Sequence, residues 1–332
     1  MSEKTRVLVA GASGLTGALA ARLVWNHPSL ELAAVSARSD VGARLDELHP
    51  RHRVPMTLEE LDLDRLEELD AAIVCYPHGA SAPLVAELRG LGVQVVDLSA
   101  DFRLRDLPTY ELWYGTHGEP DLLEGAVYGV TELYRSAVRE AELVANPGCY
   151  PTATVLALAP LAEAGLVSEV VVSAASGVSG AGRGAADFAE AAENFSPYGV
   201  DGHRHYPEIA QELRALGADG PLTFVPHLLP IDQGLLASCF VTPSREVTAD
   251  ELRELYRARY DGEPFIELVD GPPGVRDVRE TNHCRIHVAV DSGGERILAF
   301  AAIDNLWKGA AGQAVQNLNL MLGLDETEGL AP

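Results

Sequence analysis

The feature that most constrains the fold lies near the N-terminus, where an apolar run leads directly into a glycine-rich turn. Residues 6–10 (RVLVA) have the length of a strand, residues 11–17 read GASGLTG, and residues 18–25 have a helical pattern. A strand, a glycine turn and a helix in this order set the helix N-terminus against a pyrophosphate. The spacing GxxGxxG is a variant of the dinucleotide-binding fingerprint, and the expected cofactor contacts are Gly11, Ser13, Gly14, Leu15, Thr16 and Gly17. The alternative is a tight turn that needs glycine only for its positive φ.

The end of the next predicted strand indicates which dinucleotide binds. Residues 30–36 form a second strand, and the chain continues as Ser36-Ala37-Arg38-Ser39. A site that prefers NAD usually has an acidic residue at this strand end, and this chain has none there. A hydroxyl and a guanidinium suit the 2′-phosphate of NADP, because arginine can bind phosphate through two N–H groups. Ser36 and Arg38 are therefore candidate NADP(H) contacts, although a solvated loop arginine also fits the pattern.

Further apolar runs alternate with helical segments through the first half of the chain. Runs at 71–76 and 93–98 have the length of strands, and residues 82–91 between them have a helical pattern. Strands that alternate with helices predict an α/β fold with a parallel, doubly wound sheet. We expect the ends of both strands to face the cofactor, which makes Ser99, after the second run, a further candidate contact.

The segment Asn146-Pro147-Gly148-Cys149-Tyr150-Pro151-Thr152 contains a candidate nucleophile. A short apolar run precedes it, and a helix is predicted from about residue 153 to 166. Proline and glycine predict a sharp turn, so Cys149 is expected where a strand ends and a helix begins. The partial positive charge of a helix N-terminus favours a thiolate over a thiol. On this segment alone, a nucleophile and a small buried cysteine are equally good interpretations.

The pattern changes after this helix. Runs of strand length, which predict a second and largely antiparallel sheet, lie at 169–175, 222–225, 235–242, 284–290 and 296–303. The first run leads into a Gly- and Ser-rich stretch from Ser176 to Arg183, where small residues allow close approach by a ligand, so Ser176 and Gly177 are candidate contacts. A Gly/Ala-rich segment opens a last helix through about residue 322. It predicts tight packing or a cofactor surface, with Asn305 and Asn317 as candidates.

A histidine pair forms the second chemical cluster, in His203-Arg204-His205-Tyr206-Pro207-Glu208. In an extended chain the two histidines point the same way, and Pro207 then opens a helix. They could bind a metal, but the sequence offers no third ligand. By itself the segment fits a solvated polar turn. Beside a candidate nucleophile, the interpretation as a general acid/base gains support.

Composition excludes several classes of protein. The chain of 332 residues has a formal charge of −24, which disfavours binding to nucleic acid through its phosphates. The four cysteines show neither CxxC nor metal-like spacing, so we expect no metal site and no disulfide framework. We find no signal peptide and no apolar run near the ~20 residues of a membrane helix. We therefore expect a soluble, cytoplasmic, two-domain protein with no membrane partner.

Taken together, these segments resemble the N-acetyl-γ-glutamyl-phosphate reductase family of arginine biosynthesis. The resemblance runs nearly end to end and is carried by GASGLTG (11–17), PHG (77–79), DLSADFRL (97–104), NPGCYPTAT (146–154), SGVSGAGR (176–183), GHRHYPEI (202–209), PHLLP (226–230) and IDNLWKGAAGQAVQN (303–317). It implies an NADP-binding Rossmann domain over 1–148, completed by a C-terminal helix within 305–332. It also implies a catalytic and dimerisation domain over 149–304, resembling that of glyceraldehyde-3-phosphate and aspartate-semialdehyde dehydrogenases.

The resemblance also implies a reaction and the residues that perform it. Cys149 would form a thioester from a small acyl phosphate, and NADPH would reduce it to N-acetyl-L-glutamate 5-semialdehyde. His203 and His205 would be the acid/base residues, with His205 preferred because it adjoins the helix start. Candidate substrate contacts are Asn146, Arg183, Arg204 and Glu208. The family also implies a homo-oligomer, a dimer or a tetramer.

One departure from the family pattern leaves the substrate open. The family usually has an Arg-Gly pair after the PHLxP stretch, where this chain reads Ile231-Asp232-Gln233-Gly234. If that arginine binds a substrate anion, Gln233 weakens the contact and Asp232 opposes it. One alternative function is the analogous reduction of carrier-bound aminoadipyl phosphate in lysine biosynthesis. A non-enzymatic alternative is an NADP-binding redox sensor that signals through Cys149, against which the histidine pair argues.

Overall fold

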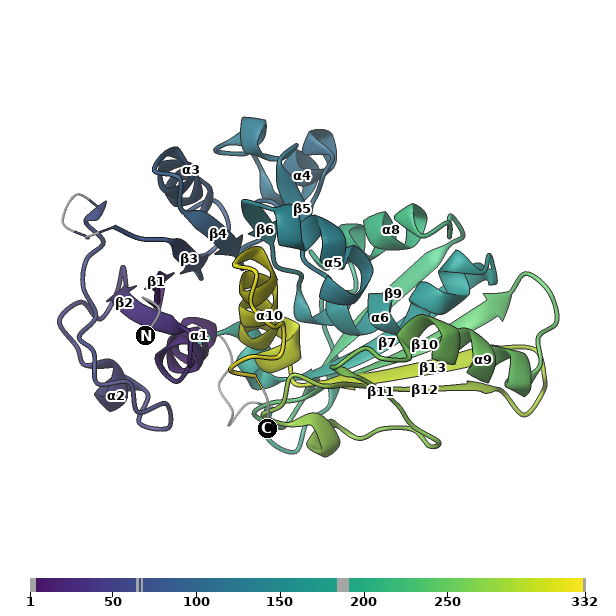
Figure 1. Cartoon of the computed structure of the whole chain (residues 1–332). Coiled ribbons are helices and arrows are strands. Elements are labelled where there is room, and N and C mark those ends of the chain that lie inside the picture. The colour runs from purple at the N-terminus through teal and green to yellow at the C-terminus, as the bar shows by residue number, and fades with distance from the viewer. Residues whose placement is uncertain (1–3, 64–65, 67, 184–190, 331–332) are drawn as a thin grey trace. The chain divides into compact units, whose positions relative to one another are not determined.

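A computed structural model of the chain describes residues 4–63, 66, 68–183 and 191–330 (Figure 1). The chain divides into two units. Unit 1 comprises Met1–Pro147 and Ala310–Pro332, and unit 2 comprises Gly148–Gly309. The chain therefore enters unit 2 immediately before Cys149 and returns to unit 1 for its last helix.

Unit 1 contains a six-stranded parallel sheet in the order β2-β1-β3-β4-β6-β5. Its strands are β1 (Thr5–Ala10), β2 (Leu30–Ser36), β3 (Ala71–Val74), β4 (Gln94–Asp97), β5 (Ala126–Tyr128) and β6 (Leu143–Ala145). The chain leaves β1 toward β2 on one side and continues with β3 on the other. The carboxyl end of β1 therefore lies at the topological switch point, where sheets of this kind bind ligands. The predicted parallel, doubly wound sheet is confirmed.

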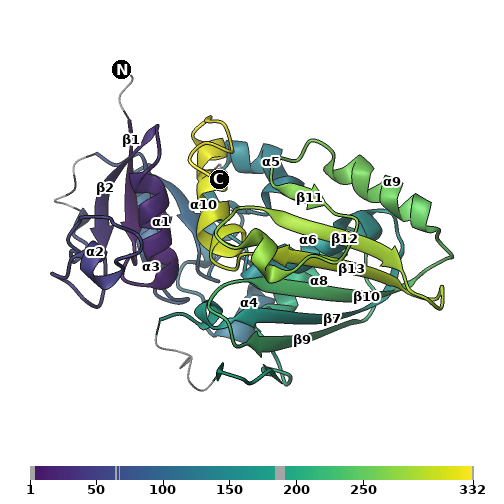
Figure 2. The same cartoon turned by 90° about the horizontal axis from the view of Figure 1, so that it is seen from below.

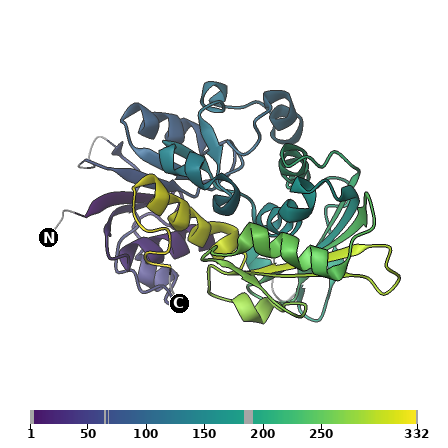
Figure 3. The same cartoon turned by 45° about the vertical axis from the view of Figure 1, so that its right-hand side comes forward.

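The helices α1 (Leu15–Trp25), α3 (Ala82–Gly90), α5 (Thr131–Glu140) and α10 (Gly312–Met321) of unit 1 pack against this sheet. Its other described helical elements are α2 (Leu45–Leu48), α4 (Leu107–Tyr114) and η2 (Pro120–Leu122). Leu8 and Val95 of the sheet and Val85 of α3 belong to one buried core cluster. The C-terminal helix α10, yellow in Figure 1 and Figure 3, lies between α1 and α5. Every residue of α10 is buried, so unit 1 depends on the end of the chain for its core.

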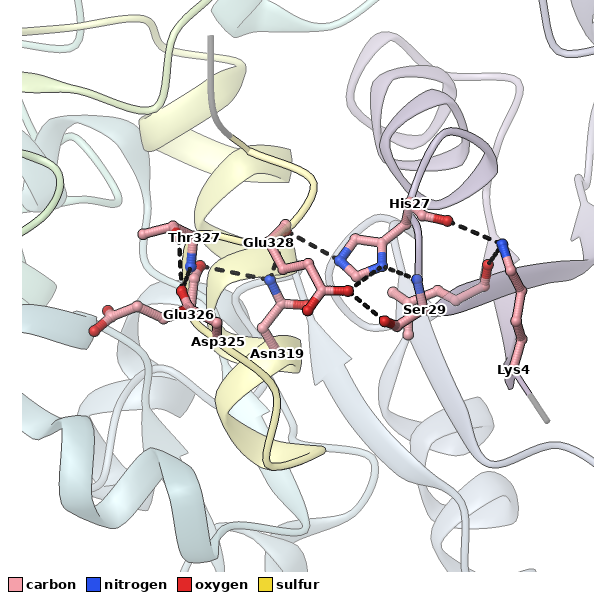
Figure 4. A network of polar contacts seen from close by, with 9 residues as sticks. Lys4, His27, Ser29, Asn319, Asp325, Glu326, Thr327 and Glu328 are labelled. Atoms are coloured by element: carbon pink, nitrogen blue, oxygen red, sulfur yellow. Dashed lines mark hydrogen bonds and ion pairs between the residues drawn. The ribbon is translucent and has the colours of Figure 1, made fainter. Parts of the chain in front are cut away.

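A polar network fastens the segment after α10 to the connection between α1 and β2 (Figure 4). His27 Nδ1 accepts from the N–H of Ser29 at 3.1 Å, so Nε2 carries the ring proton and donates to the carbonyl of Glu328 at 3.0 Å. Asn319 Nδ2 donates to the same carbonyl at 2.8 Å, and the Ser29 hydroxyl donates to the Glu328 carboxylate. Burial lowers the pKa of His27, which keeps the imidazole neutral and this bonding pattern intact.

Unit 2 contains a seven-stranded mixed sheet in the order β11-β12-β13-β10-β7-β9-β8, and its longer strands can be followed in Figure 2. Its strands are β7 (Val167–Gly177), β8 (Ser196–Pro197), β9 (Leu222–Leu229), β10 (Leu235–Pro243), β11 (Ile266–Leu268), β12 (Cys284–Val290) and β13 (Ile297–Ile303). The pairs β7–β9 and β11–β12 are parallel, and the other pairs are antiparallel. The predicted, largely antiparallel second sheet is confirmed, with two parallel pairs that apolar alternation could not indicate, because it marks a strand without marking its direction.

The helix α6 (Cys149–Glu163) packs against β10, β13, β7 and two neighbouring helices of unit 2. The other helical elements of this part of the chain are η3 (Val178–Ala181), α8 (Tyr206–Ala215), α9 (Ala249–Tyr260), η4 (Val275–Val278) and the π-helix η5 (Trp307–Ala311). The predicted start of α6 near residue 153 was too late, because the first turn of a helix tolerates Pro151. Near its other end Pro160 has no N–H for the carbonyl of Leu156. The hydroxyl of Tyr260 donates to that carbonyl at 2.5 Å instead.

Candidate active site

The predicted nucleophile lines a cavity of about 520 Å³ in unit 2. The wall combines the start of α6, the end of β7, the chain around β8 and the loop before α8. Predicted site residues in the lining are Cys149, Ser176, Gly177, His203, Arg204 and His205. Lining residues that the sequence analysis did not single out are Tyr150, Gly180, Ser196, Tyr198, Gly202 and Leu228. The cavity thus brings the cysteine motif and the histidine motif together.

Cys149 is the first residue of α6, and Gly148 before it is the N-cap in an extended conformation. The N–H groups of a first helical turn lack acceptors within the helix and carry partial positive charge. The first turn of α6 holds no acidic side chain to offset this charge. A thiolate, the nucleophilic form of cysteine, is favoured at such a position. Cys239 offers the contrast, since complete burial raises its pKa far above the ordinary value and leaves an inert thiol.

Two glycines allow other parts of unit 2 to approach Cys149 closely. A Cβ added at Gly148 would lie 2.5 Å from Nε2 of His205, so the imidazole rests against the N-cap of α6. A Cβ added at Gly309 would lie 2.7 Å from Cβ of Cys149. Any larger residue at either position would displace its neighbour, so glycine is needed here for packing. His205 is therefore held beside the residue that precedes the nucleophile.

The two predicted histidines differ in their bonding. Their ring centroids lie 4.8 Å apart, and the N–H of His205 donates to Nδ1 of His203 at 3.1 Å. Burial, and secondly the charge of Arg204, lower the pKa of His203 to about 4. His203 is therefore neutral near pH 7 with its proton on Nε2. This leaves His205 as the histidine of the pair that is better placed for proton transfer beside Cys149.

Two residues predicted to contact the substrate, Glu208 and Asn146, instead make hydrogen bonds that hold the chain before Cys149. Glu208 is buried, and its Oε1 accepts the N–H of Gly148 at 2.8 Å. Asn146 is buried within unit 1, where Nδ2 donates to the carbonyl of Ala310 at 3.2 Å. The Oδ1 atom of Asn146 accepts from Nδ2 of Asn317 at 3.1 Å. These bonds fix the backbone that leads into the nucleophile, which is a positioning role.

Two tyrosines supply hydroxyl groups to the cavity. Tyr198 donates to the hydroxyl of Tyr150 at 3.1 Å, and Tyr150 donates to the carbonyl of His227 at 3.1 Å. Both rings contact the ring of His203 edge to face. The position of Tyr150 next to Cys149 was a usable sequence signal. Tyr198 lies in a segment with no motif of its own, and only the fold brings it to α6.

Of the other predicted residues of unit 2, Arg204 lines this cavity, whereas Arg183 and Asn305 do not belong to its described lining. Both arginines are exposed. Asn305 is buried, where Oδ1 accepts the N–H of Gly234 at 2.8 Å and Nδ2 donates to the hydroxyl of Ser179 at 3.0 Å. Asn305 thereby joins the two loops behind the cavity.

Gln233, the residue that departs from the family pattern, is buried on the loop between β9 and β10. Its carbonyl accepts two bonds from the guanidinium of Arg279, at 3.0 and 3.3 Å. Among the described residues that line the cavity, Gln233 does not appear. Arg279 thus brings a guanidinium to the backbone of the same loop, where the family pattern has an arginine side chain.

In unit 1, the glycines of the first turn have different neighbours. A Cβ at Gly11 would lie 2.8 Å from the carbonyl oxygen of Cys75, and one at Gly17 would lie 2.2 Å from that of Gly11. At Gly14, the N-cap of α1, the nearest atom would be 3.7 Å away. The fold therefore requires Gly11 and Gly17, whereas the space beside Gly14 is open to a ligand. His49 Nε2 lies 2.9 Å from the carbonyl of Ser13 and holds this turn in place.

The predicted 2′-phosphate contacts lie near the same turn. Arg38 lines a cavity of about 500 Å³, with its guanidinium 6.0 Å from the ring centroid of Tyr76. The hydroxyls of Ser13 and Ser39 are 3.4 Å apart, and the hydroxyl of Ser36 is 3.4 Å from that of Tyr76. The acidic residue Glu60, which is distant in sequence from the end of β2, also lines this cavity.

Two further cofactor candidates of unit 1 are buried. The hydroxyl of Ser99 donates to Asp97 at 2.5 Å, and burial raises the pKa of Asp97 to about 6. Asn317 donates to the carbonyl of Gly129 at 2.9 Å and accepts from the hydroxyl of Thr131 at 2.7 Å.

In the described part of the chain no cluster of three or more His, Cys, Asp or Glu residues could hold a metal ion. No helix in that part is long and apolar enough to cross a membrane.

Comparisons with known proteins follow the division into two units. Residues 6–141 match the family model for the semialdehyde dehydrogenase NAD-binding domain. Residues 149–305 match the model for the semialdehyde dehydrogenase dimerisation domain. The chain is 47% identical to N-acetyl-gamma-glutamyl-phosphate reductase of Desulforudis audaxviator, over 98% of this chain and 97% of the relative.

Solved structures support the same fold. Aspartate semialdehyde dehydrogenase II of Vibrio cholerae, solved in a complex with ASA, has a TM-score of 0.74 at 19% identity and covers 97% of this chain and 99% of its own. Aspartate semialdehyde dehydrogenase of Candida albicans, solved with NADP, has a TM-score of 0.73 at 14% identity, with coverages of 96% and 99%.

Proposed function

Because the chain belongs to the N-acetyl-γ-glutamyl-phosphate reductase family, we propose that it reduces N-acetyl-L-glutamyl 5-phosphate with NADPH. The products are N-acetyl-L-glutamate 5-semialdehyde, an intermediate of arginine biosynthesis, and phosphate. The observation that carries the proposal is the contact of the His205 ring with the N-cap of α6, directly before Cys149. A nucleophile and an acid/base group on one cavity wall are what acyl transfer through a thioester requires.

In the first step the thiolate of Cys149 attacks the acyl carbon of the substrate. A C–S bond forms, the bond from carbon to the phosphate oxygen breaks, and phosphate leaves with the electron pair. The N-terminus of α6 stabilises the attacking thiolate. Arg204 at the cavity provides local positive charge for an anionic substrate that the net charge of −24 would otherwise repel.

In the second step the thioester is reduced and the aldehyde leaves. NADPH, when bound, supplies the hydride for the thioester carbon. His205 donates a proton to the resulting tetrahedral oxygen and takes it back as the C–S bond breaks, which restores the thiolate of Cys149. The carboxylate of Glu208 accepts the N–H of Gly148. This hydrogen bond keeps the backbone before Cys149 in place beside His205 through both steps.

The residues of unit 1 fit a dinucleotide, with the open space at Gly14 beside the N-terminus of α1 as the supporting observation. Arg38 with Ser36 would hold the 2′-phosphate of NADP(H). The remaining residues that we propose near the cofactor are Gly11, Ser13, Leu15, Thr16, Gly17, Ser99, Ser176 and Gly177. Asn305 and Asn317 would act indirectly, through the loops that they hold.

Self-association is also part of the proposal. The strand β10 alternates buried residues with half-buried ones such as Leu236 and Phe240, and β13 does the same with Leu298 and Phe300. Because α6 and α9 pack against this sheet on the side of the buried residues, the half-buried residues share the opposite face. Unit 2 matches a dimerisation-domain model, so we propose this face as the interface of a homodimer or tetramer.

The test is an assay of the reverse reaction, in which N-acetyl-L-glutamate 5-semialdehyde is oxidised, NADP⁺ is reduced and phosphate accepts the acyl group in the presence of the protein. We expect phosphate-dependent turnover that Cys149→Ser lowers by about 10³-fold or more. Cys239→Ala, which removes a buried thiol elsewhere in unit 2, is the matched control and retains activity. Turnover of aspartate semialdehyde or the aminoadipate analogue in place of this substrate would contradict the proposal, as would an active Cys149→Ser variant.

A further inference from the structure

We infer that Tyr198 and His203 recognise the N-acyl group of the substrate, Tyr198 by accepting its amide N–H and His203 by donating to its carbonyl oxygen. Both side chains line the cavity that contains Cys149, and their ring centroids lie 5.5 Å apart. The inference rests on the proposed function, because it assigns one substrate group to the same cavity. It makes these two residues determinants of specificity, whereas His205 serves proton transfer.

The hydrogen bonds of the two tyrosines fix what Tyr198 can offer a ligand. Tyr150 gives its one hydroxyl proton to the carbonyl of His227, which has no proton to return. The bond between the two hydroxyls is therefore donated by Tyr198. Since that proton is used, the oxygen of Tyr198 can only accept from a ligand. Burial raises the pKa of Tyr198 to about 12, so the hydroxyl keeps its proton at neutral pH.

A backbone contact fixes His203 in the complementary role. The backbone N–H of His205 donates a hydrogen bond to Nδ1 of His203. Since Nδ1 is the acceptor, the ring proton of His203 is on Nε2. The nitrogen that remains for a ligand is a neutral N–H donor, because burial and the charge of Arg204 keep the ring unprotonated. Such a donor suits a carbonyl oxygen. A carboxylate is better matched by the guanidinium of Arg204 in the same cavity.

A secondary amide carries one N–H donor and one carbonyl acceptor in a plane, which matches the pair of Tyr198 and His203. The aromatic carbons of Tyr150 and Tyr198 can cover the methyl group of an acetyl. A free α-ammonium group presents three donors and a positive charge. Of the described residues that line the cavity, none is a carboxylate and Arg204 carries positive charge, so an ammonium group finds no anionic partner there. The cavity therefore selects acylated substrates over free amines.

The test compares three aldehydes in the phosphate- and NADP⁺-dependent assay: N-acetyl-L-glutamate 5-semialdehyde, its O-acetyl analogue and 5-oxopentanoate. The O-acetyl analogue keeps the carbonyl but lacks the N–H, and 5-oxopentanoate lacks the whole group. Tyr198→Phe removes the acceptor. His203→Asn keeps an oxygen for the N–H of His205 and removes the Nε2–H donor, whereas His203→Gln restores an amide donor at that distance.

We expect Tyr198→Phe and His203→Asn each to lower kcat/KM for the N-acetyl substrate about tenfold, mainly through KM. Turnover of 5-oxopentanoate changes less than about twofold, because it has no group for these residues to bind. Tyr198→Phe has no further effect on the O-acetyl analogue, and His203→Gln recovers part of the loss. Tyr206→Phe, which removes a hydroxyl from the same segment outside the cavity lining, is the matched control.

Equal losses for all three aldehydes would mean that the two residues are only structural and would overturn the inference while leaving the proposed function intact. Unchanged kinetics in both variants would do the same. If the wild-type protein turns over none of the aldehydes, the proposed function fails, and the inference fails with it. A preference of the wild type for 5-oxopentanoate over the N-acetyl substrate would also contradict it.

Discussion

The two strand–turn–helix junctions of the molecule share a local pattern and differ in what occupies the space beside the glycines. In unit 1, the N-cap glycine of α1, Gly14, has no protein atom within 3.4 Å of an added Cβ, the nearest being 3.7 Å away. In unit 2, the N-cap glycine of α6, Gly148, has the His205 ring at 2.5 Å. The space beside the first helix N-terminus is open to an external anion, whereas the N-cap of the second is covered by the His205 ring, next to Cys149. In the function that we propose, the positive end of a helix serves ligand binding in one unit and activation of a nucleophile in the other.

Each junction also has a pair of histidines with divided roles. At the glycine turn, His49 contacts the carbonyl of Ser13, and burial lowers the pKa of its neighbour His52 to about 4. At the cysteine turn, His205 contacts the N-cap, and burial lowers the pKa of His203 to about 4. In both pairs one ring adjoins the turn and the other is held neutral. The comparison shows that a low pKa alone does not identify a catalytic histidine.

Among changes at the junction glycines, the largest effect on turnover is expected from Gly148→Ala. The added Cβ would displace the His205 ring, and a displacement near 1 Å at a reacting group costs roughly a hundredfold in rate. Steady-state kinetics should show a fall in kcat of about that size with an unchanged KM for NADP⁺. Gly90→Ala, in α3 with no atom within 4 Å of the new Cβ, is the control and should be active. A normal kcat for Gly148→Ala would remove His205 from the mechanism.

Gly14→Ala and Gly17→Ala should separate binding from stability in unit 1. We expect Gly14→Ala to raise the Kd for NADP⁺ about tenfold or more with little change in Tm, because the methyl group enters only the ligand's space. Gly17→Ala places its Cβ 2.2 Å from the carbonyl of Gly11 and should lower the free energy of unfolding by about 3 kcal/mol. Calorimetric binding and urea unfolding measure the two effects. An unchanged Kd for Gly14→Ala would show that the pyrophosphate lies elsewhere.

Arg38→Leu should change the choice of cofactor. Loss of a charge-assisted contact to the 2′-phosphate is expected to lower kcat/KM for NADP⁺ by about 10- to 100-fold and to leave kcat/KM for NAD⁺ nearly unchanged. The ratio of the two values, measured with the same aldehyde, gives the result. Arg51→Leu, a change at an exposed arginine outside this cavity lining, is the control. A parallel fall for both cofactors would assign Arg38 a structural role.

The smallest expected effect is on the free energy of unfolding at acidic pH, through His52 and His203. Above pH 6.5, the ordinary pKa of histidine, His52 and His203 are neutral in both the folded and the unfolded chain. As pH falls from 6.5 toward 4 only the unfolded chain gains these protons, so stability is lost. His52→Gln and His203→Asn should each reduce the loss between pH 7 and 5 by about 1 to 2 kcal/mol in urea unfolding. Asp97 and Asp304, whose pKa burial raises to about 6, act in the opposite sense, so each variant is compared with the wild type.

Much of the fold and part of the site follow from patterns within short segments. The parallel sheet of unit 1, the second sheet and the positions of Cys149 and the histidines relative to helix starts were predicted correctly in kind. The start of α6 and the two parallel pairs in the second sheet were not, because a tolerated proline and a strand's direction leave no periodic signal. Tyr198 and Gly309 were missed because their importance lies in which residues they contact.

The sequence by itself determined the two glycine turns, the residue types at each helix N-terminus and the family. These depend on neighbouring residues and on the order of apolar runs along the chain. The tertiary structure decided that His205 rests on Gly148, that Nδ1 of His203 is occupied and that Tyr198 can only accept. The contacts of His205 with Gly148 and of Tyr198 with Tyr150 join residues about 50 positions apart in the chain, and the bond to Nδ1 of His203 depends on the conformation of the loop before α8. Apolar periodicity encodes which residues are buried, but it does not encode which residues become neighbours.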